Sequence, residues 1–243
     1  RNKSNSLIFM SNKSIIAATV AALAFSLGAK AQTNLQTFYD FDRECITSTI
    51  EMFKGDKWGN TFFFIDYDYQ LKTAKGTVDS PSSTYFEIAR CLNFWQDTAL
   101  GAFSAQIEYN GGVGTIMAPG TRDFYGVNHA ILVGVDYFLH SKNFNNTLNL
   151  KVLYKKFKNL EQKVPLQFTA VWGCQDLFGL KGLRFSGFAD VWWEGKCVFL
   201  SEPQVWYGFG EHFNIGTEIE LSSNFAGYDG FACRPCLGVK WVF

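Results

Sequence analysis

The chain has 243 residues, carries 22 Lys and Arg against 22 Asp and Glu, and is 47% hydrophobic but only 18% charged. The hydrophobic share excludes a largely disordered chain, and the balanced charge argues against a nucleic-acid binder held by a basic surface. The residues typical of coiled coils do not dominate the composition. The 25 Phe and 22 Gly favour strands and tight turns over helices.

The first 31 residues have the three parts of a secretory signal peptide. Residues 1–13 carry three cations and no acid, residues 15–27 form an apolar run, and Ala29-Lys30-Ala31 provides a small-residue cleavage site. The apolar run is shorter than the ~20 residues that a membrane-spanning helix needs. We therefore expect residues 1–31 to be removed, which leaves residues 32–243 as one domain with 18 cations and 22 acids.

Apolar and polar residues alternate along most of this domain. Residues 103–110 read FSAQIEYN, and residues 61–69, 184–194 and 215–221 repeat the pattern. Because successive side chains of a strand point to opposite faces, each of these segments predicts a strand with one apolar and one polar face. About twelve segments match: 35–42, 45–53, 61–70, 84–95, 102–110, 130–139, 147–157, 166–175, 183–194, 197–207, 214–222 and 233–243.

The connections between these segments predict a barrel with two different ends. Short connections (54–60, 96–101, 140–146, 178–182 and 208–213) fall at one end, and the longest ones (71–83 and 111–129) fall at the other. Outer-membrane barrels have short turns at one end and longer loops at the other. The expected fold is therefore all-β, a transmembrane antiparallel barrel of about 12 strands.

Sparse charge predicts which face of the barrel meets lipid. The expected domain has only 40 charged residues among 212, which is few for a soluble surface. The polar face is acidic but also includes Arg90, Arg184 and Arg234, as suits a wet lumen. We expect the apolar face to lie against lipid.

The C-terminal strand carries a feature of outer-membrane barrels. It alternates and ends with Trp241 and Phe243. An aromatic residue two positions before a final Phe resembles the signal that the barrel assembly machinery reads. We therefore expect the outer membrane of a Gram-negative bacterium as the location, with outer-membrane lipid and the assembly machinery as partners.

Four segments carry a wider resemblance: LQTFYDF (35–41), EMFKGDKWGNTFFFIDYDY (51–69), YFEIARCLNFW (85–95) and VPLQFTAVWGCQD (164–176). They resemble outer-membrane proteins grouped with the Tsx-type nucleoside channels, and the likeness spans the expected barrel. The resemblance implies a monomeric twelve-stranded barrel that passes nucleosides. It assigns no binding position of that family to a particular residue here.

A lumen selective for nucleosides needs aromatic faces for stacking, and carboxylates or Arg for hydroxyls and ring edges. The polar faces of the expected strands supply these groups. The alternative role for each charge is an ion pair across the lumen that stabilises the wall. The candidate lumen-lining residues are Phe62, Phe64, Asp66, Asp68, Glu108, Arg184, Asp190, Trp192, Glu194, Glu218 and Glu220.

Six cysteines predict neither a metal site nor a cofactor. Cys233 and Cys236 form the single C-x-x-C, without a second pair or a nearby His to complete a zinc site. Their spacing places the two thiols on opposite faces of a strand. Disulfide bonds between some of the cysteines stay possible, because an exported protein meets an oxidising compartment.

Catalysis is not expected. The three histidines, His129, His140 and His212, lack the Ser arrangement of outer-membrane phospholipases, which also use twelve strands, and no G-x-S-x-G motif is present. We expect a passive channel for small polar solutes, with nucleosides as the first candidate. The alternatives are a phospholipase-like barrel enzyme, a structural or interaction barrel without conductance, and a soluble periplasmic barrel.

Overall fold

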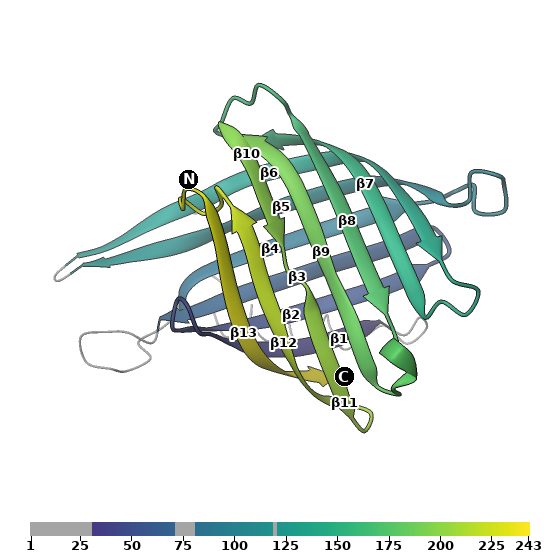
Figure 1. Ribbon diagram of the computed structural model, residues 1–243. Helices are drawn as coiled ribbons and strands as arrows, with labels where there is room; N and C mark the ends of the chain where they lie inside the picture. The colour runs from purple at the N-terminus through teal and green to yellow at the C-terminus, as the bar shows by residue number, and fades with distance from the viewer. Residues whose placement is uncertain (1–30, 71–80, 119–120) are drawn as a thin grey trace, which may run out of the picture. The chain divides into compact units, whose positions relative to one another are not determined.

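The computed structural model describes residues 31–70, 81–118 and 121–243, which form a single β-sheet rolled into a barrel (Figure 1). The predicted signal peptide, except Ala31, lies outside these residues. Within them, no helix has the length and apolar character to span a bilayer. The strands are β1 (Gln32–Asp40), β2 (Cys45–Asp56), β3 (Gly59–Gln70), β4 (Pro81–Leu92), β5 (Phe103–Ala118), β6 (Thr121–His140), β7 (Asn146–Phe157), β8 (Leu166–Cys174), β9 (Leu183–Glu194), β10 (Lys196–Ser201), β11 (Gln204–Phe209), β12 (Phe213–Ser223) and β13 (Phe231–Val242).

The thirteen strands fill twelve positions of a closed antiparallel barrel. From β1 to β9 each strand pairs with the next one in the chain, β12 pairs with β13, and β13 pairs with β1, so the sheet closes on itself. Both β10 and β11 pair with β9 and with β12, so they share one position. Pro203, which has no N–H to donate to the ladder, lies between them. The predicted twelve-stranded antiparallel barrel is thus confirmed.

The segment between β5 and β6 corrects the sequence analysis. Residues 111–129 were expected to form a loop, but most of them extend β5 and β6 into a long two-stranded hairpin. An irregularity in register between Asn110 and Gly112 marks where this extension begins. The expected contrast in loop length also fails among the described connections. The turn at 93–102 lies at the end that was expected to carry only short turns, yet it is longer than the connections at 41–44 and 158–165 at the opposite end.

Strand register separates the side chains into an inner and an outer set. Side chains opposite each other on paired strands share a face. The face of Gln36, Leu132 and Trp206 contains nearly all of the most deeply buried side chains, and we call it the inner set. The outer set, represented by Val133 and Val152, is largely exposed.

The outer set has the polarity of a lipid-facing wall. Aliphatic side chains form its middle: Ile50, Ile88, Ile107, Val133, Val135, Leu150, Val152, Val191, Val205, Ile215, Leu237 and Val239. Exposed aromatic side chains gather near the end that holds Gln32 and Phe243 (the terminal end) and near the opposite end (the far end). They include Trp58, Phe94, Phe103, Phe209, Phe213 and Trp241 at the terminal end and Tyr39, Phe41, Tyr67, Tyr154 and Phe231 at the far end. An apolar band between two aromatic girdles is the pattern of outer-membrane barrels.

Arg90 contradicts its predicted place in the lumen. Its register opposite Ile107 and Thr61 puts it in the outer set, close to the terminal end of β4. There its Nη1 lies 2.7 Å from Asp56 Oδ2. This pair neutralises both charges where the wall leaves the apolar band.

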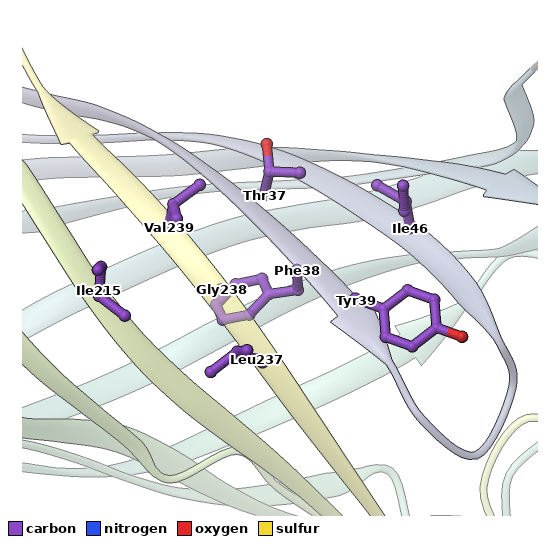
Figure 2. A pocket seen from close by; sticks show the side chains of 8 residues that line it. All are labelled: Thr37, Phe38, Tyr39, Ile46, Ile215, Leu237, Gly238 and Val239. Atoms are coloured by element: carbon purple, nitrogen blue, oxygen red, sulfur yellow. The ribbon is translucent and has the colours of Figure 1, made fainter.

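The seam that closes the barrel has glycines at its centre. Gly216 on β12 and Gly238 on β13 lie opposite each other in the inner set. The rings of Trp206 and Phe38 lie against them from inside, with the ring centroids 5.4 Å apart. On the outside, a shallow apolar groove runs along the seam, and Figure 2 shows the side chains that line it, from Thr37 on β1 to Ile215 on β12.

Gly216→Ala should destabilise the barrel by about 1–3 kcal/mol, the usual effect of overpacking. An added Cβ would collide with the Val205 carbonyl oxygen and with the indole of Trp206. Urea unfolding of the refolded protein measures the effect. Gly126→Ala is the control, because a Cβ there meets no atom within 4 Å. Equal unfolding midpoints for the two variants would refute the close approach at the seam.

Candidate functional site in the barrel lumen

The inner set divides the lumen into two walls of different charge. Over β1–β6, without the extension of the β5–β6 hairpin, the inner set has seven carboxylates and, among the described residues, no Lys or Arg. Over β7–β13 it has six cations and four carboxylates. The acidic wall carries Asp40, Glu51, Asp66, Asp68, Glu87, Glu108 and Asp136; the mixed wall carries Lys151, Lys155, Arg184, Lys196, Arg234 and Lys240 with Asp190, Glu194, Glu218 and Glu220.

All eleven sequence-predicted lumen residues belong to the inner set. The structure brings Phe62, Phe64, Asp66 and Asp68 together on β3 and places the others on β5, β9 and β12. Three of them differ from the rest, because Glu108, Trp192 and Glu220 are buried. Whether any of the eleven contacts a solute stays a prediction.

Aromatic rings on β3 and β4 form a continuous ridge on the acidic wall. The centroids of Phe62 and Phe64 lie 6.1 Å apart, and those of Phe64 and Tyr85 lie 6.0 Å apart. All three side chains are partly exposed. The ridge offers faces on which a flat solute could stack.

Hydroxyl groups of the neighbouring strands orient the two β3 carboxylates. Thr49 Oγ1 donates to Asp66 Oδ1 at 2.6 Å, and Thr47 Oγ1 donates to Asp68 Oδ1 at 2.7 Å. Ser83 also donates to Asp68. The described residues place no cation in contact with either carboxylate.

The mixed wall holds two lysines, buried Lys155 and partly exposed Lys240, on aromatic faces. Lys155 Nζ donates to Gln167 Oε1 at 2.7 Å and lies 4.2 Å from the ring centroid of Trp192. Lys240 Nζ lies 4.1 Å from the ring centroid of Trp206. Cation–π contacts of this kind hold the two ammonium groups against the wall.

Polar bonds also hold the predicted charges of β9 and β12. Thr169 Oγ1 donates to Asp190 Oδ1 at 2.5 Å, and Gln204 Nε2 donates to Glu218 Oε2 at 2.6 Å. Arg184 donates to Asn214, and Trp192 Nε1 donates to Glu194 Oε2 at 3.1 Å. These side chains are therefore oriented before any solute arrives.

An ion network fills the far end beside the seam. Glu220 accepts from Arg234 Nη1 at 2.5 Å and from Arg43 Nη2 at 2.9 Å, while Arg43 also pairs with Asp40. Burial favours the neutral form of the Arg43 guanidinium, but attraction to Glu220 and the bond to Asp40 outweigh it and raise the pKa of Arg43. The network ties the 41–44 turn to the inner face of β12 and β13.

An apolar cluster occupies the far end across β6–β10. Its buried members include Leu132, Leu153 and Trp192. Leu160 from the 158–165 connection and Phe225 from the 224–230 connection pack against it. The open part of the lumen is consequently bounded by the partly exposed inner residues of β2–β4 and β7–β9.

Sequence reasoning missed several polar residues of the same lumen. Glu87 and Tyr85 on β4, Asn110 on β5, and Lys151 and Lys155 on β7 all belong to the inner set. The alternation of polar residues was present in the sequence, because these residues lie at every second position along their strands. For Tyr85, Glu87, Lys151 and Lys155 it was not used, since β4 and β7 alternate less cleanly than β3 or β5; Asn110 lay on the polar face of an alternating segment but was not selected.

The cysteines and histidines show no catalytic arrangement within the described residues. All six cysteines are free, and Cys233 and Cys236 face opposite sides of β13 as expected. His129 bonds the Tyr109 hydroxyl, and the other two histidines bond backbone carbonyl oxygens through Nδ1. None of the three bonds a Ser hydroxyl there.

Together the closed sheet and the polar inner set define a twelve-stranded antiparallel β-barrel with an apolar exterior. The chain belongs to the family described as "Domain of unknown function (DUF5020)", whose model matches residues 23–243. The Tsx-type relationship accordingly rests on the four sequence segments alone.

Solved barrels share the architecture at low sequence identity. The chain is similar to an outer membrane phospholipase (OMPLA) dimer of Salmonella typhi with bound calcium, with 14% identity, coverage of 89% of this chain and 92% of that one, and a TM-score of 0.54. It is also similar to the KdgM porin, with 9% identity, 87% and 99% coverage and a TM-score of 0.49. No curated protein matches the chain. The likeness to the phospholipase barrel shows the fold alone.

Proposed function

We propose that the protein is an outer-membrane channel that passes small polar solutes passively, with nucleosides as the first candidates. The observation that carries the proposal is the polarity of the wall. The middle of the outer set is aliphatic, while the inner set carries seventeen charged side chains. A soluble barrel would place these sets the other way round.

The composition of the acidic wall supports a polar, partly aromatic solute. The ridge of Phe62, Phe64 and Tyr85 lies beside the oriented carboxylates of Asp66 and Asp68. Stacking on such rings contributes about 1–3 kcal/mol per base, which is weak enough for release. Carboxylates accept hydrogen bonds from sugar hydroxyls and from the amino groups of bases.

Planar-bilayer conductance of the purified protein tests the proposal, with nucleosides, sugars and amino acids added in turn. We expect open-channel current that nucleosides reduce. Absence of current would favour a structural or interaction barrel. The ion network and the apolar cluster at the far end of the lumen would then be the groups that block it. Current that nucleosides leave unchanged would retain the channel and remove this solute class. Lipase and protease assays on the same preparation test the phospholipase-like alternative.

Asp66→Ala with Asp68→Ala should shift ion selectivity away from cations. Both carboxylates face the lumen without a contacting cation among the described residues, so they attract cations into it. The reversal potential under a salt gradient measures the shift. Asp97→Ala with Asp123→Ala is the matched control, because these carboxylates lie in the exposed 93–102 turn and in the exposed part of the β5–β6 hairpin. Unchanged reversal potentials in the first variant would show that Asp66 and Asp68 do not line the ion path.

A further inference from the structure

Two glutamates of the acidic wall share one asparagine. Asn110 on β5 lies opposite Glu87 on β4 and one inner position away from Glu108. Its Nδ2 lies 3.0 Å from Glu87 Oε1 and 3.3 Å from Glu108 Oε1, so one amide donates to both carboxylates. The three side chains form a cluster that we call the Glu–Asn–Glu triad.

The other donors around the triad are already in use. The Tyr85 hydroxyl donates to Glu87 Oε1 at 2.7 Å, and Gln106 Nε2 donates to Glu108 Oε2 at 2.7 Å. Neither glutamate forms an ion pair among the described residues. The two adjacent carboxylates accept hydrogen bonds from neutral donors only, while Lys151 and Lys155 attract Glu108 without bonding it.

Asn110 carries the observation that points to a ligand. The residue is only 3% exposed, and its Oδ1 atom is buried without a hydrogen-bond partner. A buried acceptor without a partner costs about 1–3 kcal/mol, so such atoms usually serve a water or a ligand. Its own Nδ2 is committed to the glutamates, so the amide orientation presents Oδ1 as a third acceptor of the triad.

The acceptors of the triad match an ammonium group. A primary ammonium has three N–H donors and one positive charge, and the triad has three acceptor groups and two negative charges. The described part of the chain contains no group of three or more His, Cys, Asp or Glu side chains that could hold a metal ion. Charge and donor count therefore both favour the organic cation.

The surroundings leave this role to a solute. The nearest lysines of the inner set are on β7, where Lys155 is bound to Gln167 and lies on Trp192. Lys151 forms no ion pair with either glutamate in the described structure. On the other side, Tyr85 and Phe64 continue the aromatic ridge from Glu87, which is itself partly exposed. An ammonium at the triad would thus carry its attached ring or chain onto these aromatic faces.

We propose that Glu87, Glu108 and Asn110 bind a primary ammonium group of a passing solute, which adds amine-bearing aromatic solutes to the nucleosides as a second solute class. The inference rests on the proposed channel function. It predicts that the triad recognises both the N–H donors and the positive charge of the solute's ammonium group.

Three related probes test the proposal in planar bilayers: 2-phenylethylammonium, its N,N,N-trimethyl derivative and 2-phenylethanol. We expect the half-blocking concentration of the primary ammonium to be about tenfold lower than that of either other probe, as one lost charge-assisted hydrogen bond implies. Glu87→Gln and Glu108→Gln should each reduce the ratio between the half-blocking concentrations of the other probes and the primary ammonium by about tenfold. Equal block by the primary and trimethyl probes would show that the triad does not recognise the N–H donors of the ammonium group, and would overturn the proposal.

Controls separate failure of the triad from failure of the channel. Asp97→Asn should leave the preference intact, because this carboxylate lies in the exposed 93–102 turn and not in the lumen. Heat-modifiable migration shows that each variant folds. Calorimetry in detergent measures the same three probes without current. Amine-selective binding without current would retain the triad and refute the channel, whereas current without amine preference would do the reverse.

Discussion

Glu220→Gln should lower the free energy of unfolding by about 3 kcal/mol, which is the lower end of the range for breaking a buried ion pair. The Glu220 side chain is only 4% exposed and binds two arginines, Arg43 and Arg234. Removing its charge leaves the Arg234 guanidinium buried, with Asp42 at 3.2 Å as its remaining ion-pair partner. We expect the lower end of this energy range because Arg43 is half exposed and retains its ion pair with Asp40.

Asp229→Asn is the matched control for this variant. Asp229 also forms an ion pair in the far half of the barrel, with Lys196 at 2.6 Å, but its side chain is 81% exposed. Exposed pairs contribute about 0–1 kcal/mol. Urea unfolding in lipid vesicles compares the two variants. Similar losses would mean that water reaches the Glu220 network as freely as it reaches the surface pair.

Alternation predicted the strands and their faces because its physical basis is local. The side-chain period of two assigns each residue to a face regardless of which strand is next to it. For this reason Asp66, Glu108 and Asp190 were assigned to polar strand faces before any pairing was known, and the strand register puts all three in the inner set. The interruption at Pro203 did not disturb this assignment, because Leu200 and Gln204 stay on the same face across it.

The β5–β6 hairpin shows where local reasoning fails. Gly111, Gly112, Gly114 and Gly126 are typical turn residues, and their clustering predicted a loop. In the structure, cross-strand pairing continues through them, with register pairs from Gly112 to Ala118 on β5. Pairing between strands depends on the partner segment, which a single-segment pattern does not contain.

Contacts across the lumen were also beyond reach of the sequence. Arg43 and Glu220 are separated by 177 positions in the chain and meet only because β1 closes against β13. The Glu–Asn–Glu triad depends in the same way on the register between β4 and β5. A shift of that register by one residue would turn Glu108 and Asn110 to the lipid face.

Val152→Arg should cost about 2–4 kcal/mol of folding free energy in vesicles, the measured cost for Arg at the lipid face of a barrel midplane. Val152 is 50% exposed and lies between Val135 and Phe168 in the aliphatic middle of the outer set. If water surrounded this wall, an exposed Val→Arg substitution would change the folding free energy by no more than about 0.5 kcal/mol. Val164→Arg is the control, because Val164 is 45% exposed but lies in the 158–165 connection outside the barrel wall. A loss at Val152 with none at Val164 identifies lipid as the solvent of the wall, whereas no loss at either position favours the soluble periplasmic barrel.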